Sequence, residues 1–293
     1  MKPTLTSRLS YALLGLCFAI TTQLAFANPC DGGRIFVANN DTGTIGDYNL
    51  DGTAVNASLI SGLSSPTGIA TDGRYLYVVT GGTVGKYGLN GDVVNASLFT
   101  GGSFGIVASG GYLYVTNGFS IGKYTTSGAT VNASLITGPN AFTGIAVSGS
   151  DLFVLSQDGG TIGKYGLNGN AVNAALVTGL HDAGTLAASG SDLFVTFSDP
   201  AAIGEFDFNG DVYNASLITG LPGPHSLTVF GDKLFVTNAG YGTISECDVN
   251  GNIINAALIT GLANPHGIAV VGVPEAEFVI NGLHDCFRTV KLS

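Results

Sequence analysis

Histidines at repeated places in the sequence are the residues best suited to chemistry. Pro224-His225 and Pro265-His266 occupy equivalent places in successive stretches of the chain, and His181-Asp182 lies in the stretch before them, shifted by about three positions. Imidazoles held close together can bind a transition metal or act as an acid–base pair. Duplication of one stretch would give the same placement without any function, so both interpretations stay open. The candidate ligand-binding residues are His181, Asp182, His225 and His266.

Three asparagines form a second candidate set. Asn39, Asn117 and Asn238 follow similar apolar runs at matching positions. Their amides could line the same site as the histidines. The alternative is that they hydrogen-bond to their own backbone in turns, which is a common use of asparagine.

The sequence lacks the residue patterns of known catalytic centres. It holds no nucleophile elbow, no H-E-x-x-H and no phosphate-binding loop. The segment 207–211 resembles a calcium loop but lacks the later bidentate Glu, and it aligns with hairpin turns elsewhere in the chain. We therefore predict no catalytic residues, no metal site and no cofactor.

These candidates must be positioned by elements that repeat. An anchor asparagine recurs at intervals of 39, 37, 41, 41 and 41 residues, at Asn56, Asn95, Asn132, Asn173, Asn214 and Asn255. Each complete unit contains four β-type runs, such as 144–148, 151–156, 161–167 and 171–177, which we name a, b, c and d. Four strands in a unit of about 40 residues are typical of a β-propeller blade.

The anchor asparagines also head four N-A-S sequons. Asn173 and Asn255 keep the Asn in N-A-A, without the Ser. The repeat therefore requires the Asn itself, which favours a structural role over glycosylation.

The ends of the repeat predict how a ring would close. The first unit starts with run b at 34–37 and has no run a, whereas the last recognisable run, 267–271, is an a run with no b, c or d after it. We predict an all-β, six-bladed propeller with four antiparallel strands per blade. In it, strand 267–271 pairs with 34–38 and completes the N-terminal blade, 34–63. Closure removes exposed sheet edges. An open β-solenoid is the alternative, but it does not need these complementary ends.

Variation in link length points to one face of this propeller. Because consecutive strands alternate in direction, the d–a and b–c links share one face and the a–b and c–d links share the other. The spacings across the a–b and c–d hairpins are constant, and the length differences fall in the d–a and b–c links. Variable loops on a rigid scaffold often bind partners, although long links also drift freely. The histidines lie in d–a links, so this face is where we expect a binding site.

The repeat resembles known propeller families. The runs P-x-G-I-A-V, L-F-V-x-N and T-I-G-x-Y resemble NHL-type six-bladed propellers. The ending N-A-S-L-I-T-G-L resembles a repeat family of exported bacterial proteins that often carry a PEP-CTERM sorting tail. The resemblance covers about residues 34–272. The run 273–275 falls where such a tail would begin, but Ala276 replaces the second Pro, and neither an apolar helix nor an Arg-rich end follows. The tail is degenerate, so membrane sorting is not carried over.

Propellers of the gluconolactonase type hold a metal at the axis with a Glu, Asn and Asp set. The four Glu of this chain lie in c runs or in the tail, at Glu205, Glu246, Glu275 and Glu277. The resemblance therefore does not supply the central Glu that such an enzyme needs.

The two termini predict the destination of the chain. Residues 1–27 read as a secretory signal peptide, with Lys2 and Arg8 before an apolar stretch and Ala25-Phe26-Ala27 as the cleavage site. We expect a propeller domain over 28–272 and an irregular tail over 273–293. Cys30 and Cys286 flank the repeats and could form a disulfide, and the alternative is unpaired thiols.

Charge limits the partners. The signal holds two of the ten basic residues and no acidic ones, which leaves eight basic against twenty acidic residues. This balance argues against nucleic acid. We expect a secreted, periplasmic or cell-surface protein, monomeric and without a membrane span in the mature chain. It would bind a polysaccharide or protein partner on the d–a/b–c face without catalysis. The alternative is a lactonase-like or streptogramin-lyase-like hydrolase or lyase with a His-based site at the mouth of the axis.

Overall fold

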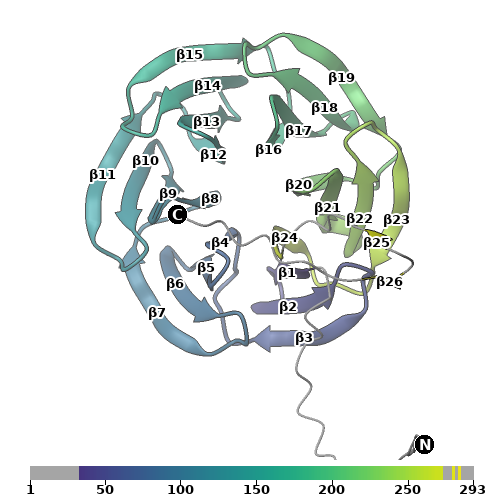
Figure 1. The fold of residues 1–293 in the computed structure, drawn as a ribbon. Helices are drawn as coiled ribbons and strands as arrows, with labels where there is room; N and C mark the ends of the chain where they lie inside the picture. Colours follow the sequence, from purple (N-terminus) through teal and green to yellow (C-terminus); the bar gives the residue numbers. More distant parts are fainter. Residues whose placement is uncertain (1–32, 273–278, 281–282, 285–293) are drawn as a thin grey trace, which may run out of the picture. The chain divides into compact units, whose positions relative to one another are not determined.

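The protein is a six-bladed β-propeller (Figure 1). The structure, a computed structural model, describes residues 33–272, 279–280 and 283–284. The first three blades in chain order are β24-β1-β2-β3 (Pro265–Val271, Arg34–Asn39, Thr44–Asn49, Ala54–Ile60), β4-β5-β6-β7 (Ile69–Thr71, Tyr75–Thr80, Thr83–Gly88, Val93–Thr100) and β8-β9-β10-β11 (Ile106–Ser109, Tyr112–Asn117, Ser120–Thr125, Thr130–Thr137).

The other three blades have the same order from the axis outward. They are β12-β13-β14-β15 (Phe142–Ser148, Asp151–Ser156, Thr161–Gly166, Ala171–Thr178), β16-β17-β18-β19 (Ala183–Ser189, Asp192–Ser198, Ala201–Asp207, Val212–Thr219) and β20-β21-β22-β23 (Pro224–Phe230, Lys233–Asn238, Thr243–Asp248, Ile253–Ile259). A short helix, η1 (Ala239–Tyr241), lies between β21 and β22, and β25 (Val279–Ile280) pairs with β26 (Leu283–His284). In these described parts no helix is long and apolar enough to cross a membrane.

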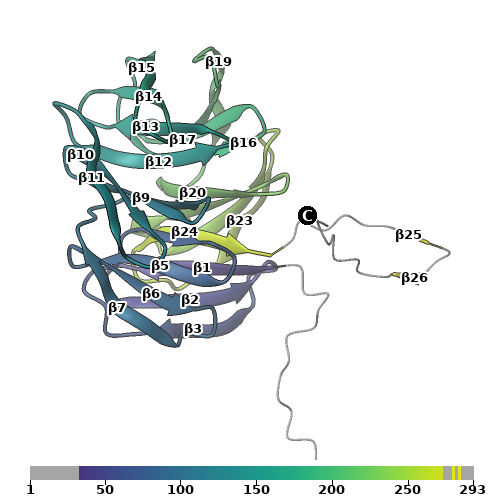
Figure 2. The ribbon, with the colours of Figure 1, turned by 60° about the vertical axis from the view of Figure 1, so that its left-hand side comes forward.

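The ring closes as predicted from the incomplete units at the two ends of the repeat. Strand β24 pairs antiparallel with β1, with Ile268 opposite Val37 and Val271 opposite Arg34. Figures 1 and 2 show the yellow β24 beside the purple β1, although more than 220 residues separate them in the chain. Strand β24 begins at Pro265, two residues before the predicted start, so His266 belongs to the innermost strand.

The core lies between blades. Each b strand buries one aromatic ring at the same register position, and these rings are at most 1% exposed: Phe36, Tyr77, Tyr114, Phe153, Phe194 and Phe235. Neighbouring blades share each apolar cluster; Ile35 and Val37 of β1, for example, pack with Phe235 of β21. Burial of each such side chain contributes about 2 kcal/mol. The result is a rigid ring whose innermost strands are held at fixed positions around the axis.

The anchor asparagine has the structural role that its repetition indicated. Asn56 Oδ1 accepts a hydrogen bond from the Ser58 N–H at 3.1 Å, and the five other anchors repeat this contact with the residue two positions on. Residue pairing between strands c and d shifts at this point in every blade. The asparagine therefore stabilises a bulge, which protects an outer edge strand from pairing with another chain.

Candidate ligand site at the propeller axis

Each blade contributes one residue to a ring of positions around the axis. Near the centre of each innermost strand, an Ile or Leu pairs with strand b. The residue in question lies two positions before that Ile or Leu. We call these six residues the axial ring: Thr67, Phe104, Thr143, Gly184, His225 and His266. The next position along each strand holds only Gly, Ser or Thr and the one after it only Ile or Leu, whereas this position holds four residue types with different chemistry.

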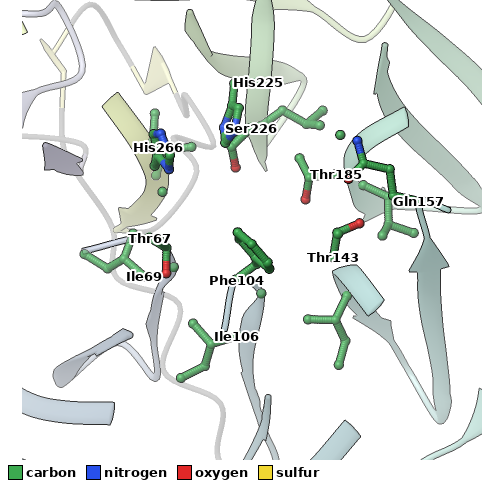
Figure 3. A pocket seen from close by; sticks show the side chains of 18 of the residues that line it. Thr67, Ile69, Phe104, Ile106, Thr143, Gln157, Thr185, His225, Ser226 and His266 are labelled. Atoms are coloured by element: carbon green, nitrogen blue, oxygen red, sulfur yellow. The ribbon is translucent and has the colours of Figure 1, made fainter. Parts of the chain in front are cut away.

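The axial ring lines a cavity of about 420 Å³. Its wall also includes Gln157 and Asp158 from the β13–β14 link and Ser198 at the end of β17. These belong to b–c links, so the cavity lies at the face where length variation predicted a site. Figure 3 shows the labelled side chains directed toward one shared space. A cavity of this size accommodates a small molecule or the end of a larger one.

The two histidines form a close pair in this wall. The ring centroids of His225 and His266 are 4.4 Å apart, and the ring planes are tilted by 34°. Threonines hold their backbones: Thr196 Oγ1 donates to the His225 carbonyl at 3.0 Å, and Thr237 Oγ1 donates to the His266 carbonyl at 3.1 Å. Each threonine lies in the b strand of the preceding blade, so inter-blade bonds set the positions of the pair.

The histidine pair is neutral at pH 7. The His225 side chain is exposed to the cavity, but nearby protein atoms reduce its contact with water. This loss of solvation, together with the neighbouring His266, lowers the pKa of His225 to about 4. Burial also lowers the pKa of His266, against an opposing effect of the Asp41 carboxylate. His266 Nδ1 is buried without a hydrogen-bond partner. Each neutral ring therefore carries one unprotonated nitrogen, although His266 Nδ1 is covered by protein and reaches the cavity only if the ring rotates.

An aromatic side chain lies across the axis from the histidines. Phe104 is 51% exposed, and Figure 3 shows it opposite His225, with Thr67 on one side and Thr143 on the other. Thr67 Oγ1 donates to the Ser103 carbonyl at 3.0 Å, Thr143 Oγ1 is buried without a partner, and Thr185 also lines the cavity. The cavity wall thus combines one exposed apolar face with several hydrogen-bonding groups.

Gly184 breaks the ring of side chains. A Cβ at this position would lie 2.9 Å from the His225 carbonyl oxygen and 2.9 Å from Thr196 Oγ1. A side chain would therefore disturb the bond that holds the His225 backbone. Because Gly184 has no side chain, Gln157 and Thr185 form the cavity wall near it (Figure 3).

The other predicted site residues lie away from the axial cavity. His181 and Asp182 are exposed and line a separate hollow with Gln157 and Asp158. Asn39 and Asn238 are buried in their own blades, where they donate to Thr44 Oγ1 and Thr243 Oγ1. Asn117 is exposed at the end of β9. A ligand role for these five residues stays a prediction.

The predicted disulfide lies outside the described residues, because Cys30 and Cys286 are not among them. The described Cys247 is a free, buried thiol. Among residues 33–272, no three His, Cys, Asp or Glu side chains converge on one point.

Sequence reasoning missed most of the axial ring. It found His225 and His266 but not Phe104, Thr67, Thr143 or the contribution of Gln157. An alignment of the six internal repeats that compares the residue two places before each central Ile or Leu would have shown this variable position.

The fold has well-characterised neighbours among solved structures. A chain of a nidogen/laminin complex matches with a TM-score of 0.68 at 16% identity, over 82% of this chain and 98% of that one. A catalytically inactive virginiamycin B lyase from Staphylococcus aureus with quinupristin matches with a TM-score of 0.57 at 16% identity, over 78% and 85%. A streptogramin B lyase matches with a TM-score of 0.53 at 18% identity, over 70% and 72%. The sequence matches no protein-family model and no curated protein.

These neighbours establish the propeller architecture and include proteins of different function. One belongs to a complex between proteins and two are lyases. At such identities the likeness concerns the fold alone, and one fold supports many activities. The function must be argued from the axial site.

Proposed function

We propose that this protein is an exported, non-catalytic binding protein that holds the end of a polysaccharide chain in its axial cavity. The observation that carries the proposal is the axial ring, because equivalent positions of the six blades hold Thr, Phe, Gly or His and all of them line one cavity. Export rests on the signal-peptide pattern of residues 1–27.

The cavity lining supports a neutral sugar as the ligand. The exposed face of Phe104 suits the apolar face of a sugar ring, and the Thr185 hydroxyl and the Gln157 amide can donate to and accept from sugar hydroxyls. Among the residues that line the cavity there is no Lys or Arg. Nothing there carries a fixed positive charge, which favours an uncharged ligand over an anionic one.

A glycan array with the purified protein tests this proposal. We expect retention of a neutral glycan, and we expect Phe104→Ala to weaken that binding about tenfold, or about 1.4 kcal/mol. Tyr213→Ala is the matched control, because Tyr213 is 62% exposed on the outer strand β19. Equal binding by Phe104→Ala and the native protein would contradict the proposal. If the protein instead captures a protein partner, and both variants still bind that partner, the binding site lies on the outer surface and not in the axial cavity.

A second candidate is a hydrolase or lyase with a His-based site at the axis. The neutral pair of His225 and His266 favours it, because unprotonated imidazole can accept a proton from a substrate. Incubation with quinupristin and a panel of lactones, followed by mass spectrometry, tests it. Product formation that disappears in His225→Ala and His266→Ala would replace binding with catalysis as the function.

A further inference from the structure

The histidine pair has features that sugar binding does not explain. Two imidazoles come from equivalent positions of neighbouring blades and lie against each other, with centroids 4.4 Å apart. His266 Nδ1 is buried and lacks a hydrogen-bond partner. A buried polar atom without a partner is costly in a folded protein unless something binds it.

The separation of the two rings fits coordination of one metal ion. Metal–nitrogen bonds of about 2.1 Å that meet at a right angle, as in square-planar Cu²⁺ or Ni²⁺ sites, would place two imidazole centroids about 4.5 Å apart, whereas the tetrahedral angle of Zn²⁺ sites would place them about 5 Å apart. The observed 4.4 Å agrees with the right-angle value, so rotation of the rings about their side-chain bonds can direct one nitrogen from each toward a shared ion without movement of the blades. The inter-blade bonds from Thr196 and Thr237 already hold both backbones at this spacing.

The surroundings favour a cation. The Asp41 carboxylate acts on His266, Asp158 lines the cavity, and no Lys or Arg is part of its wall. The sequence as a whole has a formal net charge of −10. Imidazole ligands select late first-row divalent ions such as Zn²⁺, Ni²⁺ and Cu²⁺ over Mg²⁺ and Ca²⁺.

We propose that His225 and His266 together bind one late first-row divalent metal ion at the axial cavity. The cavity leaves the other coordination positions of the ion open to water or to a bound molecule. With two protein ligands, the site differs from a closed structural metal site, and we expect an affinity in the micromolar range. This inference is independent of the proposed glycan binding.

Titration of the purified, untagged protein with Cu²⁺ or Ni²⁺ tests the inference, with calorimetry for stoichiometry and electron paramagnetic resonance of the Cu²⁺ form for the ligand atoms. We expect one ion per chain and a spectrum with two coupled imidazole nitrogens. His225→Ala and His266→Ala should each weaken binding about tenfold or more. Tyr213→Ala is the matched control, since Tyr213 is 62% exposed on the outer strand β19, and it should bind as the native protein does.

Several results would overturn the inference. The absence of saturable binding at millimolar metal would do so, as would binding that survives both axial variants. Equal loss in Tyr213→Ala would show that the loss is not specific to the histidine pair. Thermal unfolding of each variant without metal shows whether it is folded, and His225→Asn, which keeps a polar side chain of similar reach, repeats the test if an alanine variant is unstable.

Discussion

At the scale of single residues, the axial histidines carry both the chemistry of the site and a cost in stability. His225 has a pKa of about 4 in the folded protein, below its usual 6.5, chiefly because the site is poorly solvated and His266 is adjacent. A group whose folded pKa is depressed stabilises the fold when it is deprotonated. That contribution is complete above the unfolded pKa and is lost as pH falls from about 6.5 through about 4.

Acid should therefore destabilise the native protein more than a variant without this titration. We expect the melting temperature of His225→Gln to fall less between pH 7 and pH 4 than that of the native protein. All other titratable groups are the same in both proteins, so the difference between the two curves isolates His225. Val94→Ala, which changes an exposed side chain of β7 and no titratable group, serves as the control and should follow the native curve. Parallel curves for His225→Gln and the native protein would contradict this prediction, which differential scanning fluorimetry can check.

At the scale of the strand, the outer bulge depends on a compensating pair of residues. In four blades a Tyr of strand c folds back over a Gly two positions earlier, and a Cβ on that Gly would lie 2.6 Å from the Tyr ring, as at Gly85 and Tyr87. The sixth blade has Ser245 and Cys247 at these positions. Ser245 Oγ donates to the Ala256 carbonyl at 2.7 Å and occupies the space that a Tyr side chain fills elsewhere. The small Cys247 is what makes room for this hydroxyl.

This exchange predicts a double-mutant result. Cys247→Tyr should destabilise the protein by about 1–3 kcal/mol, because its ring would meet the Ser245 side chain. Ser245→Gly in the same chain should restore most of that loss by returning the blade to the common pair, with a coupling of about 1 kcal/mol or more. Urea unfolding of both single variants and the double variant measures this coupling. Additive losses would show that the two positions do not compensate each other.

At the scale of the whole molecule, the fold was predictable because the repeat specifies it many times over. The first unit lacks an a run, and one extra a run, 267–271, follows the last complete unit. Pairing of this extra run with the first unit gives six complete blades, as the structure shows. The candidate site was predictable only in part. Residues about 40 positions apart in the sequence meet at the axis. The histidines were recognised because of their chemistry, whereas Phe104 and the threonines have the residue types expected in any strand.

The direction of individual side chains was harder to predict. Asn39, Asn117 and Asn238 all end their b strands with the same parity, yet Asn39 and Asn238 are buried and Asn117 is exposed. The two buried amides donate to Thr44 and Thr243 on the neighbouring c strand, whereas Asn117 lies opposite Ser120. Chemical type alone suggested a shared mouth for these amides, whereas the partner on strand c separates the buried pair from the exposed residue.

Closure also predicts where the chain can be shortened. Strand β24 supplies the inner edge of the first blade, and its Ile268 and Ala269 are buried among residues from the flanking blades. Truncation after Asn264 removes this strand, exposes the backbone edge of β1 and deletes His266 from the axis. We expect this chain to lose cooperative unfolding and to aggregate, because an open β edge pairs readily with other chains. Truncation after Gly272 is the matched control, which retains β24 and should stay soluble and unfold cooperatively. Circular dichroism melts and size-exclusion chromatography compare the two, and a soluble, cooperatively folded 264-residue chain would show that the ring does not depend on its final strand.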